Sequence, residues 1–314
     1  MSLPKPDVIC THESDLDGLV AGGLLRRLAK TLHGAEVLLQ AWNYQGWKMR
    51  PMNERCAWVT DFTFESRLDR SGWVVIDHHT TSVAAQKAQL IHDSSKSASL
   101  LCYELCQAAG IGSAALDRLV QLTNIGDLWL RRDPEFELAC DYANLVKTYG
   151  FWHMHDLIGG ELERLLDHPL LEVMAVKRRV EDPLGYEWSR AHVERISPEV
   201  GVVHTTVGNT NLIVHHLLER GATPFKVLAT YFPKSNRTIV VSFRSLNGEA
   251  LGVAAKLQGG GHPNAAGTTL PKSVQDVESA TLYLREVLDS APMATGLACR
   301  NMLNPFRPTD VTSP

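Results

Sequence analysis

The segment Trp73-Val74-Val75-Ile76-Asp77-His78-His79 decides how the rest of the chain is interpreted. Four apolar, largely β-branched residues are typical of a parallel strand that is buried on both faces. An acid and two histidines follow at once, so this strand would deliver polar groups at its carboxyl end. Buried strands do not usually end in this way, and the question is which other segments converge on the same point.

Strand candidates alternate with helical patterns on both sides of this segment. The other strand candidates in the first part of the chain are residues 7–11, 36–40, 57–61 and 89–93. Residues 19–32 and 97–109 have helical spacing, whereas 42–55 is expected to be an irregular connection. Because strands that alternate with helices form parallel sheets, the first part of the chain is predicted to fold around one such sheet.

The pattern changes after residue 116. Helical spacing continues to about Arg195, with breaks near Gly126, 133–134, 159–160 and 168–169, and with Pro183-Leu184-Gly185 interrupting the last piece. A second α/β unit follows. Its expected strands are 200–207, 225–232, 238–243 and 267–270, and its expected helices are 211–220, 249–257 and 274–288.

The predicted fold class is α/β, in two domains. A parallel-sheet N-terminal domain (1–140), a helical connector (141–196) and a smaller mixed α/β C-terminal domain (197–290) precede a loosely ordered tail (291–314). The 314 residues, of which 44% are hydrophobic, suffice to build two cores.

The composition excludes some classes of protein. The 31 Lys and Arg residues against 35 Asp and Glu give a net charge of −4, which is not the basic surface of a duplex-coating nucleic-acid binder. No apolar run approaches the roughly 18 residues of a membrane helix, and the N-terminus has no signal-peptide core. We therefore expect a cytoplasmic protein whose six cysteines are free thiols.

Acidic and histidine side chains gather at the predicted strand ends, and in an open parallel sheet these ends face one crevice. The set is His12, Asp15, Asp17, Asp61, Asp77, His78, His79 and Asp127. Five carboxylates share a crevice only when cations neutralise them, and oxygen with imidazole suits Mn²⁺ or Fe²⁺. Residues 1–140 carry a net charge of −3, which becomes +2 without these five aspartates. The acidity of this domain therefore belongs to the predicted site.

These motifs closely resemble those of a known superfamily. His12-x-x-Asp15-x-Asp17-Gly18, Asp61, Asp77-His78-His79, Asp127 and, downstream, Gly259-Gly260-Gly261-His262 follow the order found in the DHH phosphoesterase superfamily and its DHH-associated C-terminal domain. The superfamily includes RecJ-type exonucleases, nano-RNases, adenosine 3′,5′-bisphosphate (pAp) phosphatases, cyclic-dinucleotide phosphodiesterases and family II inorganic pyrophosphatases. The resemblance covers about residues 7–290.

The resemblance implies a centre of two divalent cations, with Mn²⁺ as the expected metal. One cation would be held by His12, Asp15 and Asp61, and the other by Asp17, Asp61, His78 and Asp127. Asp61 would therefore bridge the two, and a hydroxide between them would attack phosphorus. Family members differ in the spacing before the Asp-x-Asp pair, so a purely structural histidine at the strand end stays the alternative for His12.

Three of these residues are expected to be catalytic: Asp61, Asp77 and His79. Asp77 is expected to orient an imidazole, because metal-bound histidines usually need such a partner, and His79 is expected to contact the phosphate. The substrate-binding residues of the second domain would be Arg244, Ser245, Gly259, Gly260, Gly261 and His262. Consecutive glycines let backbone N–H groups approach a phosphate, and an arginine fork matches its oxygens. The predicted active site thus lies in the cleft between the two domains.

Several other residues are second candidates. We expect His153, His155, His215 and His216 to be structural or surface histidines, because no acids stand at ligand spacing. Trp42, Tyr44 and Trp47 either pack under their loop or stack on a base. His92 and Asp93 are candidates for lining the crevice, and Ser97 or Ser99 for binding an anion at a helix start.

The predicted function is a metal-dependent phosphoesterase that cuts short oligonucleotides or phosphorylated nucleotides, as nano-RNases and pAp phosphatases do. The chain ends soon after the glycine motif, which leaves no room for the extra domain of RecJ-like exonucleases. A RecJ-like single-strand exonuclease is nevertheless the first alternative, and a non-enzymatic nucleotide sensor is another. Inorganic pyrophosphatase is disfavoured by the glycine–histidine motif. The expected partner is the substrate, with no membrane, and a homodimer is left open.

Overall fold

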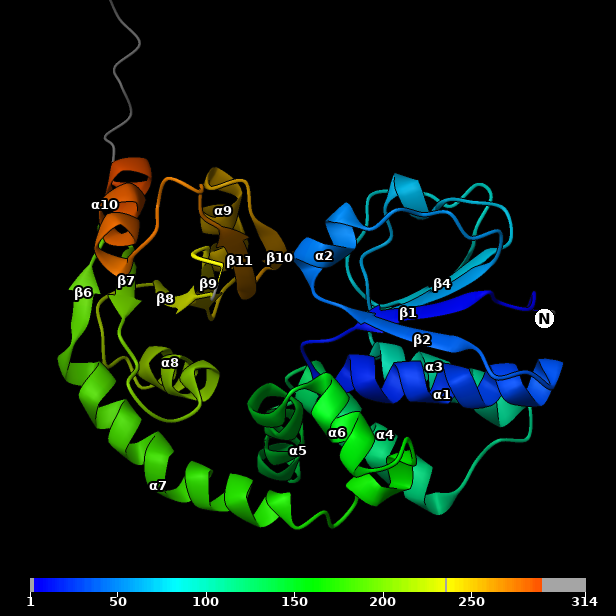
Figure 1. Ribbon diagram of the computed structural model, residues 1–314. Coiled ribbons are helices and arrows are strands. Elements are labelled where there is room, and N and C mark those ends of the chain that lie inside the picture. Colours follow the sequence, from blue (N-terminus) through cyan, green and yellow to red (C-terminus); the bar gives the residue numbers. More distant parts are fainter. Residues whose placement is uncertain (1–2, 235, 290–314) are drawn as a thin grey trace, which may run out of the picture.

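The computed structural model describes residues 3–234 and 236–289, which form two sheets joined by one long helix, α7 (Leu170–Ala191) (Figure 1). The fold class is α/β, as predicted. The tail 291–314 and Cys299 lie outside the described residues, and the exact domain limits stay a prediction. No helix in the described ranges is long and apolar enough to cross a membrane.

The first sheet is parallel throughout. Its strands are β1 (Val8–His12), β2 (Leu38–Trp42), β3 (Ala57–Thr60), β4 (Trp73–Asp77) and β5 (Gln89–His92), in the order β2-β1-β3-β4-β5. β3 pairs with both β1 and β4. The carboxyl ends of these three neighbours therefore meet at one edge, where the sequence places His12, Asp61 and Asp77.

Both faces of the first sheet are covered, which explains why its strands are almost wholly apolar. Ile9 packs with the helices α1 (Leu16–His33) and α3 (Ala98–Ala108), whereas its neighbours Val8 and Cys10 pack in a separate cluster with Trp47 and Phe62. The remaining elements of this half are η1 (Ser66–Leu68), α4 (Ala114–Asp127), α5 (Phe136–Tyr149), α6 (Phe151–Leu157) and η2 (Leu162–Leu165).

Two expectations about local structure were wrong. Residues 42–55 include the helix α2 (Tyr44–Met49), which begins because the Asn43 side chain accepts a hydrogen bond from the Gly46 N–H at 2.8 Å.

α7 continues through Pro183, where the sequence predicts a break. Gly185 in that segment serves packing, because a Cβ there would lie 2.1 Å from the Val207 carbonyl oxygen. Pro183 has no N–H to donate to the carbonyl oxygen of Arg179, four residues earlier. Because this side of α7 is exposed, water can hydrogen-bond to that oxygen, and the helix continues past the proline.

The second sheet is mixed, with the order β10-β11-β9-β8-β7-β6. Its strands are β6 (Val193–Arg195), β7 (Val200–Val203), β8 (Val227–Pro233), β9 (Ile239–Ser245), β10 (Gly260–His262) and β11 (Ala265–Thr269). The helices of this half are α8 (Thr210–Glu219), α9 (Glu249–Lys256) and α10 (Val277–Leu288). β6 replaces the end of a predicted helix. β10 makes the predicted glycine turn an edge strand, because it pairs with β11.

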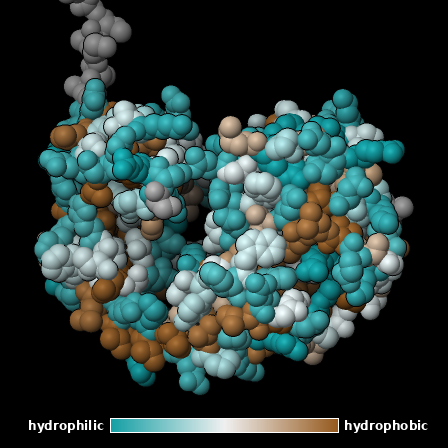
Figure 2. All heavy atoms as spheres, viewed as in Figure 1, coloured by the Kyte–Doolittle hydropathy of each residue, from teal (hydrophilic) through white to brown (hydrophobic). Residues whose placement is uncertain are grey.

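The two halves touch at several points around a hollow that Figure 2 shows between them. Asn236, between β8 and β9, donates to the Gln45 side chain on α2 at 3.2 Å. Asn209, at the start of α8, donates to Asn144 on α5 at 3.2 Å. These contacts come from loops and helix ends at the border of the hollow. The carboxyl ends of the strands of the first sheet point toward the second half (Figure 1).

Candidate metal centre and substrate cleft

His12, Asp15 and Asp61 form a first group whose ligand atoms all lie within 4.8 Å of one another. His12 Nδ1 lies 2.7 Å from Asp15 Oδ2 and 3.6 Å from Asp61 Oδ2. The fold fixes this geometry, because His12 ends β1 and Asp15 caps α1 by accepting from the Gly18 N–H at 3.0 Å. His12 thus lies beside Asp15 and Asp61, which are the other two residues of the first predicted cation site, and their roles as ligands stay a prediction.

Asp17, His78 and Asp127 form a second group of the same size. His78 Nε2 lies 3.4 Å from Asp127 Oδ2 and 3.7 Å from Asp61 Oδ1. The two oxygens of Asp61 therefore face different groups: Oδ2 faces His12, and Oδ1 faces His78. This is the arrangement that a bridging carboxylate requires, although the ligand roles themselves stay a prediction.

Asp61 stands in an unusual backbone conformation. Its φ is +59°, in the left-handed region, directly after the last residue of β3. Its N–H donates to the Ile76 carbonyl oxygen of β4 at 3.2 Å, which holds the turn in place. Aspartate and asparagine tolerate this conformation better than most residues, and such strain is characteristic of functional sites. The backbone thus turns the Asp61 side chain into the space between the two groups.

Asp17 is fixed by the first turn of α3. Its carboxylate oxygens accept hydrogen bonds from the N–H groups of Ala98 and Ser99, both at 2.9 Å. Ser97 and Ser99 were candidates for binding an anion at this helix start, but the anion found there is Asp17 itself. The positive end of the helix dipole therefore stabilises a buried carboxylate of the site.

Asp77 and His79 form a hydrogen-bonded pair. His79 Nδ1 lies 2.7 Å from Asp77 Oδ1, and the His79 carbonyl oxygen is 2.8 Å from His92 Nε2. Asp77 is fully buried at the end of β4, so it orients the imidazole of His79 and leaves Nε2 for other contacts. Asp77 thus orients His79, which is the expected phosphate contact, and not the predicted metal ligand His78. Within the described residues, Nδ1 of His78 has no hydrogen-bond partner.

The electrostatics of the site favour cations. Burial raises the pKa of Asp17 to about 6, with the charge of Asp61 adding to the effect. Burial, followed by the charge of Asp17, also raises the pKa of Asp127 well above its usual range. Burial opposes ionisation of His78, yet Asp61 and Asp127 raise its pKa to about 10. Cations therefore compete with protons for these side chains, and they are expected to bind more weakly as the pH falls.

The donor set fits divalent cations. The buried polar atoms without a partner include Asp61 Oδ2, Asp77 Oδ2 and His78 Nδ1, all within or beside the two groups. Such orphans are rare in folded proteins unless an ion or a water completes them. Carboxylate oxygens with imidazole nitrogens, and no thiolate, are the ligands that Mn²⁺ and related hard cations prefer.

Arg244 is held on β9 by three contacts. Its Nη1 donates to Ser242 Oγ at 2.9 Å and to the Phe243 carbonyl oxygen at 3.2 Å, and its Nη2 donates to Asn211 Oδ1 at 3.1 Å. Burial lowers the pKa of Arg244, although an arginine stays charged under all ordinary conditions. A positioned and partly desolvated guanidinium is suited to binding phosphate.

His262 of β10 reaches the edge of the first sheet that carries the predicted metal ligands. Its ring stacks on His79 with centroids 5.6 Å apart and lies 6.3 Å from the ring of His78. Burial lowers the pKa of His262, and the charges of His79, His78 and Arg244 act in the same direction. The predicted substrate-binding residues of the second half and the predicted metal ligands of the first half therefore line one cleft.

The three glycines before His262 differ in their roles. A Cβ at Gly259 would lie 2.3 Å from the Gly267 carbonyl oxygen, and Gly261 has a φ of +135°, so the fold requires glycine at both positions. Gly260 has no heavy atom within 4 Å of its Cβ position. The space there leaves the backbone open to solvent, and the approach of a phosphate to it stays a prediction.

Ser245 is buried, and its hydroxyl group is already engaged. It donates to Asn264 Oδ1 at 3.2 Å and accepts from the Ala250 N–H at 3.0 Å. This geometry gives Ser245 a supporting position behind the loop that follows His262. Its contact with substrate stays a prediction.

Lys147 was missed by the sequence analysis. It follows Asn144 by one turn on the face of α5 that meets the second half, and its side chain is exposed. Although the residue is accessible to solvent, the protein atoms around the cleft desolvate its ammonium group and lower its pKa, and Asp15, Arg244 and Asp127 are among the charges that act on it. The ammonium group therefore lies within electrostatic range of Asp15, Asp127 and Arg244. A lone lysine on a helix gives no signal in the sequence, so only the fold could identify it.

The remaining candidates have structural partners. His153 and His215 contact the Tyr149 carbonyl oxygen and the Trp129 ring respectively, as expected of structural histidines. Asp93 caps a turn by accepting from Ser95 and pairs with Lys96. Five cysteines are free, and the sixth lies outside the described residues.

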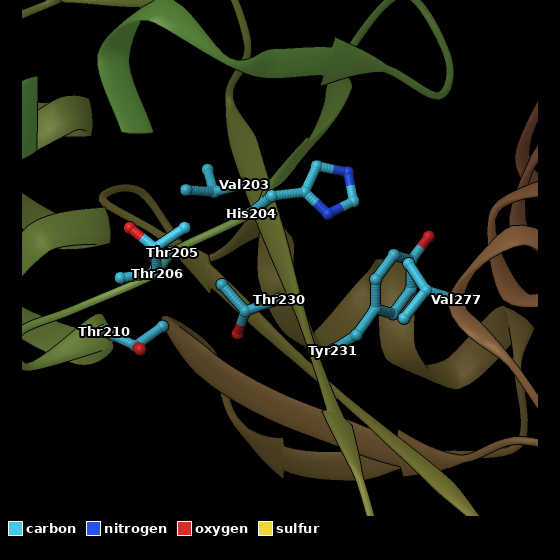
Figure 3. Close-up of a pocket in the computed structure, with 8 residues that line it drawn as sticks. All are labelled: Val203, His204, Thr205, Thr206, Thr210, Thr230, Tyr231 and Val277. Carbon is cyan, nitrogen blue, oxygen red and sulfur yellow. The ribbon is translucent and has the colours of Figure 1, made fainter. Parts of the chain in front are cut away.

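A separate cavity of about 200 Å³ lies in the second half, and Figure 3 shows the side chains that line it. Thr206 and Thr210 stand on one side, and Thr230 and Tyr231 of β8 on another. No carboxylate cluster lines it among the described residues. It is therefore distinct from the candidate site.

Neither a protein-family profile nor a curated protein sequence matches the chain. Solved structures do resemble it. A pGpG-specific phosphodiesterase from Vibrio cholerae gives a TM-score of 0.51 at 16% identity, over 89% of this chain and 99% of that chain. The DHH domain of a member of a family of ribosomal proteins also gives 0.51 at 16% identity, over 90% and 86%. RecJ in complex with Mn²⁺ from Thermus thermophilus gives 0.49 at 18% identity, over 90% and 52%.

Identities of this size show a common fold and nothing finer. The phosphodiesterase and the DHH domain share that fold over most of both chains. The likeness therefore includes both sheets and the helix between them. The chain has the fold of the DHH-domain proteins, as the order of its motifs predicts.

Proposed function

We propose that the chain is a metal-dependent phosphoesterase that hydrolyses short oligonucleotides or phosphorylated nucleotides. The observation that supports this most strongly is the position of Asp61, whose Oδ2 faces His12 and whose Oδ1 faces His78, and which belongs to two of the three overlapping groups of ligand-type side chains. When bound, two divalent cations, with Mn²⁺ as the expected metal, would act as Lewis acids that activate water and neutralise phosphoryl charge. That one neighbour in fold is a pGpG-specific phosphodiesterase is consistent with such a substrate.

The chain's own residues then divide the work of binding. His79, oriented by Asp77, donates from Nε2 to a phosphoryl oxygen, and His262 approaches the same place from the second half. Arg244 supplies positive charge from the second half, and Lys147 supplies it from α5 of the first half. Closure of the two halves excludes water and completes the site, so productive binding requires a substrate that touches both.

Tyr44 gives a reason to prefer substrates that carry a base. Its ring lies 5.1 Å from the His12 ring and packs edge-on against Phe62 at 5.7 Å, while Phe62 stacks on Trp47 at 4.2 Å. The aromatic cluster therefore fixes Tyr44, yet 42% of the residue stays exposed beside the first cation group. Gln45, the next residue, contacts the hairpin across the cleft. A rigid, half-exposed ring next to the phosphate position is a platform for stacking one nucleobase.

For a dinucleotide substrate, Tyr44→Ala is expected to raise KM by roughly 5- to 100-fold, because base stacking contributes about 1–3 kcal/mol. Tyr44→Phe should behave like the wild type, since stacking does not need the hydroxyl group. The measurement is steady-state kinetics on a dinucleotide and on an analogue that lacks one base. An equal effect of Tyr44→Ala on both substrates would show that the ring does not bind a base.

The function is tested by assaying the Mn²⁺-loaded protein on four substrates side by side: pAp, a diribonucleotide, a 5′-labelled single-stranded DNA and pyrophosphate. Hydrolysis of the first two is the expected result. Processive DNA degradation with dinucleotides untouched would instead favour the RecJ-like alternative. Binding without hydrolysis of any substrate would favour the nucleotide sensor.

A further inference from the structure

An apolar stripe runs along the outer face of α7. It consists of Val173, Val176, Val180, Leu184 and Trp188, which are between 41% and 63% exposed. The spacing of three or four residues places all five on one side of the helix. In Figure 2 this is the hydrophobic band along the lower edge, where Figure 1 shows α7. Isolated exposed apolar residues are ordinary, but a continuous stripe over four turns is typical of an interface.

The opposite face of α7 is already used within the chain. Met174 and Gly185 are buried, and Arg178 binds Asp141 of α5 through two hydrogen bonds of 3.0 Å. A Cβ on Gly185 would collide with the loop before α8. The helix is therefore anchored to both halves by its inner face, and the stripe lies on a rigid support that faces solvent.

The stripe is nearly symmetric about Val180. Val176 and Leu184 stand four residues on either side of it, and Val173 and Trp188 stand seven and eight residues away. Two such helices packed antiparallel, with a two-fold axis at Val180, would bring Val176 against Leu184 of the second copy, and Val173 to within one residue of Trp188 of the second copy. This is the self-complementarity that a two-fold homodimer requires of a single surface.

The charges beside the stripe support the same arrangement. Lys177 and Glu181 lie 3.2 Å apart within the chain, on the side of the stripe formed by Leu184 and Trp188. Glu172 and Arg190 lie on the other side, where Arg190 already pairs with Glu187 at 2.8 Å. In an antiparallel pair about Val180, Lys177 comes within one helical turn of Glu181 of the second copy, and Arg190 comes within one turn of Glu172 of the second copy. Opposite charges therefore meet on both flanks, as they do beside the seam of coiled coils.

We propose that the chain forms a two-fold homodimer through this face of α7, with the two helices antiparallel and crossing at Val180. The stripe then forms the apolar seam, and the four charged residues form its edges. Because α7 joins the two halves that carry the cleft, the dimer holds the connecting helices of both copies together while the clefts face outward. The proposal is independent of the proposed function.

Disulfide cross-linking of the full-length protein tests this geometry. In Val180→Cys the two introduced thiols face each other across the axis, so mild oxidation should convert most of the protein into a covalent dimer. Arg179→Cys, one residue away but turned off the stripe, is the matched control and should stay largely uncross-linked, as should the wild type. Cross-linking of Arg179→Cys in preference to Val180→Cys would overturn the proposed seam.

Sedimentation equilibrium supplies a measurement without added cysteines. The wild type should be dimeric at micromolar concentration, and Val180→Glu should weaken the dimer by at least about 100-fold, because two like charges would be buried against each other. Circular dichroism of this variant should be unchanged, since Val180 is exposed in the single chain. A monomeric wild type, or a Val180→Glu variant that dimerises as well as the wild type, would disprove the proposal.

Discussion

Asp61→Asn should abolish hydrolysis of every substrate, with kcat reduced by on the order of 10³-fold or more. Asn keeps the size of the side chain and tolerates the left-handed backbone at φ +59°, so the turn after β3 is retained. It replaces one carboxylate oxygen by an NH2 group, which cannot bind a cation, and it removes the negative charge. Either the side of Asp61 that faces His12 or the side that faces His78 therefore loses its oxygen ligand.

The informative measurements are kcat and the number of bound Mn²⁺ ions per chain. The variant should bind fewer ions, whereas its thermal unfolding should stay close to that of the wild type. Asp93→Asn is the matched control, because Asp93 only caps an exposed turn on the same side of the first sheet. Full activity and two bound ions in Asp61→Asn would refute the bridging role.

The second large effect is expected from Arg244→Ala. Loss of the fork should lower kcat/KM by roughly 10- to 100-fold, because hydrogen bonds to a charged group contribute about 1.5–3 kcal/mol each. The change should appear mainly in KM, since Arg244 lies on the second half and the ligand-type residues lie on the first. Substrate affinity in Ca²⁺, compared between variant and wild type, separates binding from turnover.

Arg244→Lys distinguishes charge from geometry at this position. Lysine keeps the positive charge but cannot donate to Ser242 and Asn211 while binding two phosphate oxygens, so only part of the loss should be recovered. Lys226→Ala, which removes an exposed cation paired with Glu199 on the same half, should have no effect. Equal KM values for Arg244→Ala and the wild type would place the phosphate elsewhere in the cleft.

Much of the site could be predicted because parallel strands place their carboxyl ends together. Once residues 8–12, 57–60 and 73–77 are taken as neighbouring parallel strands, His12, Asp61 and Asp77 must converge. The order of the motifs then added Arg244 and His262 from the second half. These inferences need only local patterns and the rule that governs parallel sheets.

Other features could not be predicted, since they depend on contacts between distant segments. The start of α3 binds Asp17, whose partners lie 81 and 82 residues away. Pro183-Leu184-Gly185 has the composition of a break, yet Gly185 serves the close approach of the loop before α8. In each case a long-range contact overrides the local preference, and no pattern within one segment contains it.

The sequence by itself thus determined the fold class and which acidic and histidine residues gather at the strand ends, and it indicated that the glycine–histidine motif of the second half belongs to the same site. The tertiary structure decided which imidazole Asp77 orients, that each oxygen of Asp61 faces a different group, and that Lys147 and Tyr44 border the same cleft. The physical reason is that residue type and spacing specify which groups reach an edge. The directions in which side chains point across a cleft follow only from the packing of the two halves.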